Sequence, residues 1–101
     1  TLDELLGRPE YPEERIVEHY LSLLRPDSPN ILTIHAELEG MKKIELFRRF
    51  LKAATGHHVR TMKLDDLARE LLRNPASVPV CDLASGTVDG RSGTLAVQRC
   101  A

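Results

Sequence analysis

The sequence lacks an excess of charge of either sign, and it lacks any long apolar run. Its 101 residues carry 14 Lys and Arg against 15 Asp and Glu, so the formal net charge is -1. Nucleic-acid binding usually requires a basic surface, so this balance argues against a nucleic-acid partner. No apolar run approaches the ~20 residues that a membrane-spanning helix needs. With 42% hydrophobic and 29% charged residues, the composition is that of one modest globular domain.

Cysteine is scarce, and several catalytic patterns are missing. Cys81 and Cys100 are the only two cysteines, and they cannot supply a four-cysteine zinc site. Because disulfides are rare in reducing compartments, we interpret both as unpaired thiols, with a disulfide between them as the alternative. The sequence contains no H-E-x-x-H motif, phosphate loop or G-x-S-x-G motif, so it offers none of those routes to catalysis.

The apolar pattern predicts helices that alternate with strands. Helical spacing follows Pro12, and the run after residue 30 is apolar on both faces, as in a covered parallel strand. The glycines near the end of the chain favour a hairpin. The predicted elements are helices over 12–24, 41–55 and 63–74, strands over 31–36 and 57–62, and a hairpin over 78–98.

This order predicts the α/β class, with residues 1–101 as a single α/β unit. Two parallel strands are too few to close a sheet, so apolar side chains of 31–36 should be partly uncovered. The chain also starts at Thr1 rather than Met. We therefore expect it to be a piece of a longer domain, with a processed N-terminus as the alternative explanation for the missing Met.

The segment ILTIHAELEG, residues 31–40, ends a buried strand in three titratable residues. Alternation along the strand would place Thr33 and His35 on one face. In parallel α/β folds the carboxyl ends of strands carry ligands and catalytic groups, so His35 is a candidate catalytic residue. A structural histidine is the alternative, and for an isolated strand histidine general rules favour it. Glu37 and Glu39 follow at once and could line the same site.

The predicted helix over 41–54 has a basic side opposite its apolar stripe. Such a helix can lie on an anionic membrane, although a solvated outer face is the simpler interpretation. The apolar stripe consists of Ile44, Phe47, Leu51 and Ala54, and the basic side of Lys42, Arg48, Arg49 and Lys52.

The motif TIHAELEG, Thr33 to Gly40, resembles the last conserved motif of ArnD-type deformylases. These enzymes belong to the NodB-homology polysaccharide deacetylase superfamily. Three flanking segments are also similar, at matching places: TLDELLGR, LDDLARELL and GTVDGRSGTLAVQ. The resemblance implies that the chain is the C-terminal third of a distorted (β/α) barrel that ends in a β-hairpin, and that the upstream part of the barrel is missing.

The resemblance also implies an activity, the metal-dependent hydrolysis of an N-formyl or N-acetyl group on an amino sugar linked to undecaprenyl phosphate. It assigns His35 as general acid and Asp3 as the acid that orients it. Glu37 and Glu39 would then lie on the loop after the strand, where we expect them to shape the rim of the site or contact the substrate sugar. A divalent metal, with zinc expected, would be held by ligands outside this chain. The chain alone should therefore be inactive.

The same resemblance predicts a location in the cytoplasm or at the surface of the inner membrane, where the 41–54 helix could make contact. Two other functions stay open at this point. A deacetylase of peptidoglycan or of another glycan would use the same His35. A non-catalytic α/β interaction module would instead use the basic helix or the hairpin as its binding surface.

Overall fold

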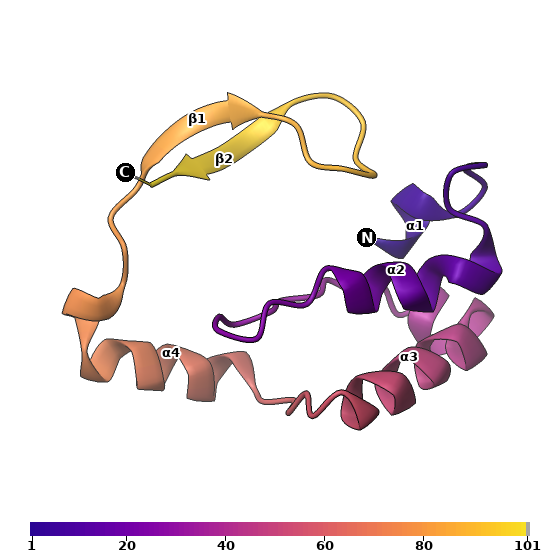
Figure 1. The fold of residues 1–101 in the computed structure, drawn as a ribbon, viewed down its shortest axis with the longest axis horizontal. Helices are drawn as coiled ribbons and strands as arrows, with labels where there is room; N and C mark the ends of the chain where they lie inside the picture. The colour runs from indigo at the N-terminus through magenta and orange to yellow at the C-terminus, as the bar shows by residue number, and fades with distance from the viewer. Residues whose placement is uncertain (101) are drawn as a thin grey trace. The chain divides into compact units, whose positions relative to one another are not determined.

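The computed structural model describes residues 1–100, which divide into two compact units (Figure 1). The first comprises Thr1–Val59, and the second begins at Arg60. Helices and one antiparallel hairpin make this a mixed fold, consistent with the α/β class, but residues 1–100 form no barrel. The α-helices are α1 (Leu2–Leu5), α2 (Ile16–Ser22), α3 (Ile44–Gly56) and α4 (Leu64–Arg73), and the strands are β1 (Asp82–Gly86) and β2 (Leu95–Arg99).

Short non-α turns lie between several of these elements. The 3₁₀ turn η1 (Glu13–Arg15) leads into α2, and the π turn η2 (Leu38–Lys42) comes just before α3. A second 3₁₀ turn, η3 (Pro75–Ser77), follows α4. Among the described residues, every helix is too short or too polar to traverse a bilayer.

Helix α1 is a single turn that begins after its N-terminal cap, Thr1. The Thr1 hydroxyl donates a hydrogen bond to Glu4 Oε2 at 2.7 Å, which ties the first turn together. Gly7 follows with φ of 80°, a left-handed conformation that favours glycine and ends the helix. The turn buries Leu2 and Leu5 completely or nearly so, and it therefore anchors the start of the chain in the core.

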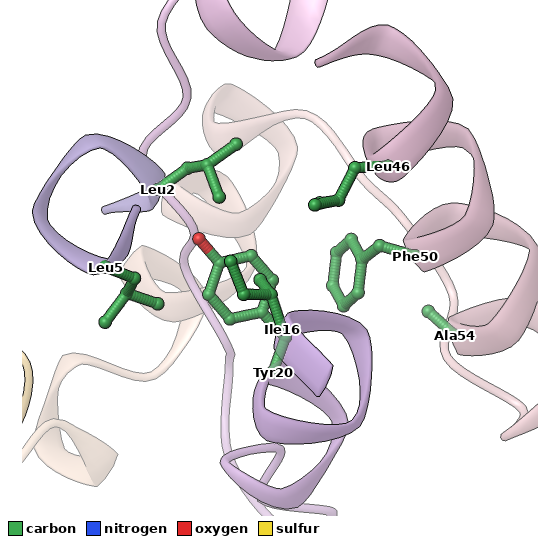
Figure 2. Close-up of a cluster of buried hydrophobic side chains, with 7 residues drawn as sticks. All are labelled: Leu2, Leu5, Ile16, Tyr20, Leu46, Phe50 and Ala54. Carbon is green, nitrogen blue, oxygen red and sulfur yellow. The ribbon is translucent and has the colours of Figure 1, made fainter. Parts of the chain in front are cut away.

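The core of the first unit lies between α2 and α3, with α1 at one end. Figure 2 shows the side chains of α2 facing those of α3. The Tyr20 and Phe50 rings meet edge to face, with centroids 5.3 Å apart. Aromatic pairs in this geometry stabilise by about 1 kcal/mol beyond the area that they bury. The buried cluster consists of Leu2, Leu5, Ile16, Tyr20, Leu46, Phe50 and Ala54.

The stripe that helix α3 buries shares only Ala54 with the predicted one. Leu46, Phe50 and Ala54 are buried, whereas Leu51 is 38% exposed and Phe47 is only half-buried. The buried residues are four positions apart and form one straight ridge, which is the row that commonly packs into a neighbouring helix. The sequence of α3 contains more than one row of apolar side chains, and packing against Tyr20 determines which row is buried.

The strand predicted over 31–36 is absent from the described structure. Ile31 is 69% exposed and Ile34 is 48% exposed, and the segment has no regular secondary structure. A strand needs neighbours to satisfy its main-chain hydrogen bonds, and none of residues 1–100 pairs with this segment. The predicted exposure of these apolar side chains is confirmed, but the strand itself is not.

The strand predicted over 57–62 is also wrong. The main-chain nitrogens of His57, His58 and Val59 donate back to carbonyls in the last turn of α3. His58 takes the left-handed conformation, with φ of 61°, so the chain turns there and Gly56 still belongs to the helix. These residues therefore form the C-terminal cap of α3 instead of pairing in a sheet.

In the second unit, α4 matches its predicted range and stops before Pro75, as Asn74-Pro75 indicates. Acidic Asp65 and Asp66 occupy its first turn and Arg69 pairs with both, which supports an isolated helix. Its apolar side chains were expected to point inward. Instead Leu64 is 65% exposed and Leu72 is 73% exposed.

The predicted hairpin is present as an antiparallel pair, β1 with β2. Gly90 and Gly93 have φ of 81° and 75°, and they make the turns of the connecting loop. Cys81 and Cys100, just outside the two strands, form a disulfide with Cα atoms 4.4 Å apart. The interpretation as two unpaired thiols is therefore wrong. Strand pairing brings the two residues opposite each other, which their spacing in the sequence does not reveal.

The observed and the predicted stripe of α3 lead to opposite expectations for the stability of variants at Phe50 and Leu51. Phe50→Ala should lower the free energy of unfolding by ~3 kcal/mol or more, because it leaves a cavity against Tyr20. Leu51→Ala, the matched control, should change it by less than ~1 kcal/mol because that side chain is partly in solvent. Urea denaturation of both variants measures the difference. A larger loss for Leu51→Ala would mean that the core is assembled differently.

Candidate active site

His35 lies where the extended segment 31–34 turns into η2. The main-chain nitrogens of Leu38 and Glu39 donate to the His35 carbonyl at 3.1 and 3.0 Å. The His35 side chain is 42% exposed, so the ring is open to solvent on one side and packed on the other. It therefore sits at the edge of the first unit, where a substrate could reach it.

Asp3 of α1 lies beside the His35 ring, as the sequence predicts. Asp3 Oδ1 is 3.7 Å from His35 Nδ1, within the range of an ion pair when the ring is protonated. The distance is longer than a hydrogen bond, and Nδ1 is buried without a hydrogen-bond partner among residues 1–100. The fold thus brings together two side chains that are far apart in the sequence, while their catalytic roles remain predictions.

The surroundings of Asp3 favour its charged form. Hydrogen bonding by the Thr1 side chain is the largest effect, and it lowers the pKa of the Asp3 carboxyl. Desolvation acts in the opposite direction, and the nearby His35 lowers the pKa further. Asp3 is therefore an anion throughout the neutral pH range and is suited to attract a protonated imidazole.

Glu39 is buried, although the sequence suggested a loop residue. Only 1% of it is exposed, and its Oε2 accepts a hydrogen bond from the His35 main-chain nitrogen at 2.8 Å. The other carboxylate oxygen, Oε1, has no partner among the described residues. A buried carboxylate is costly unless it is compensated, so this side chain is held in place by its surroundings.

Tyr20 connects this polar group to the core. Burial, together with the negative charges of Glu39 and Asp3, raises the pKa of Tyr20 to about 12. The phenol therefore stays neutral at any ordinary pH. In Figure 2 its hydroxyl points towards the side where Leu2 lies, away from Ala54. Together, His35, Asp3, Glu39 and Tyr20 form what we call the His35 cluster.

The remaining titratable candidates lie outside the cluster. Glu37 is exposed on the turn that follows His35, whereas His57 and His58 are exposed after α3. His19 packs on Tyr11 with ring centroids 4.8 Å apart. It lines a shallow hollow that contains none of the predicted site residues. No three His, Cys, Asp or Glu side chains of residues 1–100 are grouped so that they could hold a metal ion.

Sequence reasoning missed Tyr20 and the burial of Glu39. Tyr20 was assigned only to the apolar face of its helix, which is correct for the ring but silent about the hydroxyl. Glu39 was placed on a loop because the preceding residues were taken as a strand. The spacing of four residues between His35 and Glu39 is the signal for a helical turn that could have indicated their contact.

Comparison with known proteins identifies the class that the chain resembles. It is similar over most of its length to ArnD-type deformylases, which confirms the resemblance to this group. No family model matches the chain, and no solved structure matches it. The similarity therefore rests on sequence relatives.

Two of these relatives carry the same name, probable 4-deoxy-4-formamido-L-arabinose-phosphoundecaprenol deformylase ArnD. The protein of Shewanella sediminis (strain HAW-EB3) is 29% identical over 98 residues, which is 97% of this chain and 31% of that protein. The protein of Wigglesworthia glossinidia brevipalpis is 34% identical over 70 residues, covering 69% of this chain and 23% of that protein. The chain thus spans less than a third of the length of either relative.

The carboxyl of Asp3 should titrate below its ordinary pKa of 3.8 in the folded chain. Because its folded pKa is depressed, Asp3 contributes stability above its unfolded pKa, and this contribution is lost as the pH falls through the folded value. Thr1→Val removes the hydroxyl but keeps the shape, so it should move the pKa back towards 3.8. Carbon-detected NMR titration measures the pKa of Asp3 in the unmodified chain and in Thr1→Val. An Asp3 pKa at or above 3.8 in the unmodified chain would contradict this assignment.

Proposed function

We propose that this chain is part of a carbohydrate deformylase or deacetylase that hydrolyses an N-formyl or N-acetyl group on an amino sugar. The observation that carries the proposal is the juxtaposition of His35 with Asp3 in a chain that matches one ArnD-named protein over 97% of its residues. Those relatives are named for a phosphoundecaprenol-linked formamido-arabinose. We therefore propose a lipid-linked formamido sugar as the substrate.

His35 would act as the general acid. Hydrolysis of an amide adds water to the acyl carbon and breaks the bond to nitrogen, and the departing amine must then gain a proton. The Nδ1 atom of His35 faces Asp3 at 3.7 Å, which leaves Nε2 to donate that proton to the amine. Asp3 would hold the imidazolium in this orientation. A positioned acid of this kind typically contributes a rate factor of ~10²–10⁴.

The metal that the resemblance implies has no set of ligands in residues 1–100. Asp3 and Glu39 both lie beside His35, but neither they nor other described residues make a group of three around one point. The residues of this chain therefore do not fit a metal centre, and we assign them no step through one. We propose that the ligands to a divalent metal, with zinc expected, lie outside this chain.

Glu37 is the better placed of the two predicted substrate contacts. It is exposed on the turn after His35, whereas Glu39 is 1% exposed. A carboxylate at the rim can accept hydrogen bonds from sugar hydroxyl groups. We therefore propose Glu37 as a contact to the sugar.

His35→Gln in the gene product that carries this chain should keep the fold and lower turnover by at least ~10², because glutamine cannot deliver a proton to the leaving amine. His57→Gln, an exposed histidine after α3, is the matched control and should keep the parental rate. Release of formate or acetate measures both, with formamido-arabinose lipid and N-acetylated peptidoglycan fragments as rival substrates. Parental turnover by His35→Gln would show that His35 is structural.

The same assay separates the alternative functions. Release of acetate from the peptidoglycan fragments, without release of formate from the formamido-arabinose lipid, would favour the glycan deacetylase. Absence of release from either substrate, with a folded protein, would favour the interaction module. The 101-residue chain by itself should release nothing from either substrate, because the metal ligands would be missing.

The basic side of α3 would place the enzyme near its lipid-linked substrate. Reversal of Arg48, Arg49 and Lys52 to Glu should weaken binding to anionic vesicles by ~10²-fold at low salt, because each basic residue near such a surface contributes about 1 kcal/mol. Vesicle sedimentation measures the change. Reversal of Arg60, Lys63 and Arg73, which are exposed in the second unit, makes the same change in net charge as a control. Equal binding by both variants would mean that this face of α3 is simply solvated.

A further inference from the structure

The main chain of His35 is held from both sides by one residue, Glu39. The Glu39 carboxylate accepts a hydrogen bond from the His35 nitrogen at 2.8 Å, and the Glu39 nitrogen donates to the His35 carbonyl at 3.0 Å. From this reciprocal pair we infer that Glu39 is a positioning residue, which fixes the main chain of His35 so that its ring faces Asp3. The inference rests on the proposed function, because it gives Glu39 a task in the proton transfer by His35.

The carboxylate of Glu39 is not needed to close the turn. The His35 carbonyl already accepts bonds from the nitrogens of Leu38 and Glu39, at 3.1 and 3.0 Å, and these bonds define the turn by themselves. The side chain adds the bond to the His35 nitrogen, which has no such partner in a simple turn. A charged acceptor makes this bond shorter and stronger than a neutral one would.

The burial of Glu39 distinguishes its positioning role from direct contact with the substrate. With 1% of its surface exposed, Glu39 presents no group to a sugar outside the protein. Desolvation of a carboxylate is unfavourable, so its position needs compensation by a strong hydrogen bond. The bond to His35 is the one that its Oε2 makes, while Oε1 stays without a partner among residues 1–100.

Asp3 and Glu39 act on different parts of the same histidine. Asp3 comes from α1 and lies 3.7 Å from ring atom Nδ1, whereas Glu39 contacts only the main chain of His35 in the bonds described above. Asp3 therefore sets the direction of the imidazole ring, and Glu39 fixes the main-chain position from which the ring projects. Displacement by about 1 Å at such a point can lower a rate ~10²-fold.

Tyr20 lines the inner side of this arrangement. Its hydroxyl is buried without a hydrogen-bond partner among the described residues, and its ring packs on Phe50. The influence of Glu39 and Asp3 on its pKa shows that the phenol lies within electrostatic reach of both carboxylates.

The first test measures the His35 amide in the 101-residue chain by NMR. Glu39→Ala should move this amide proton upfield and speed its exchange with solvent at least ~10-fold, because the amide loses a charge-assisted bond. Glu39→Gln keeps an acceptor and should give an intermediate result, which also covers the case in which Glu39→Ala does not fold. Glu14→Ala, an exposed glutamate of η1, is the control and should leave the amide unchanged.

The second test measures turnover in the gene product that carries this chain. Glu39→Ala should lower kcat by ~10²-fold with little change in KM, and Glu39→Gln by less. In a His35→Gln background the same substitution should have no further effect, because there is no proton transfer left to position. Glu14→Ala should keep the parental kcat.

Two results would overturn the inference. One is an unchanged exchange rate of the His35 amide in Glu39→Ala. The other is an equal loss of kcat with and without His35, since Glu39 would then act elsewhere. If His35→Gln alone keeps the parental rate, the proposed function fails. The amide exchange still decides in that case whether Glu39 holds the main chain of His35.

Discussion

The contact between Tyr20 and Phe50 is the interaction on which the first unit depends. It joins α2 to α3 at the middle of the buried cluster, where the two rings meet edge to face at 5.3 Å. The same tyrosine carries its hydroxyl into the His35 cluster, so that one side chain belongs to both the core and the candidate site. The geometry around His35 therefore cannot be separated from the packing of the helices beneath it.

The electrostatics of the cluster follow from this arrangement. Two carboxylates converge on one histidine, one on its ring and one on its main chain. Like charges at close range are unfavourable, but Asp3 remains in contact with solvent and Glu39 is compensated by a main-chain hydrogen bond. Both carboxylates lie within electrostatic reach of the phenol of Tyr20, which stays neutral.

Several exposed apolar side chains lie on segments that have no strand partner or buried apolar face among residues 1–100. Ile31 and Ile34 lie on a segment that no strand pairs with, and Leu72 lies on a helix that buries none of its leucines fully. Their sequence patterns are those of covered elements, which is why the sequence predicted a strand and an inward-facing stripe. Propensity for a strand is insufficient without a neighbouring strand to complete its hydrogen bonds.

The sequence by itself determined the local features, because these depend on neighbours along the chain. The turn of α1 between Thr1 and Gly7, the end of α4 at Asn74-Pro75 and the hairpin around Gly90 all follow from residues a few positions apart. The motif around His35 also identified the class of relatives, as the comparisons confirm.

Only the tertiary structure decided which groups meet across the chain. It selected the Phe50 ridge over the Leu51 stripe, paired Cys81 with Cys100, and turned Glu39 inward to His35. Asp3 was placed beside His35 through resemblance, but their separation of 3.7 Å arises from the packing of α1 against the rest of the core. Such contacts depend on packing between distant segments, which no local pattern of residues encodes.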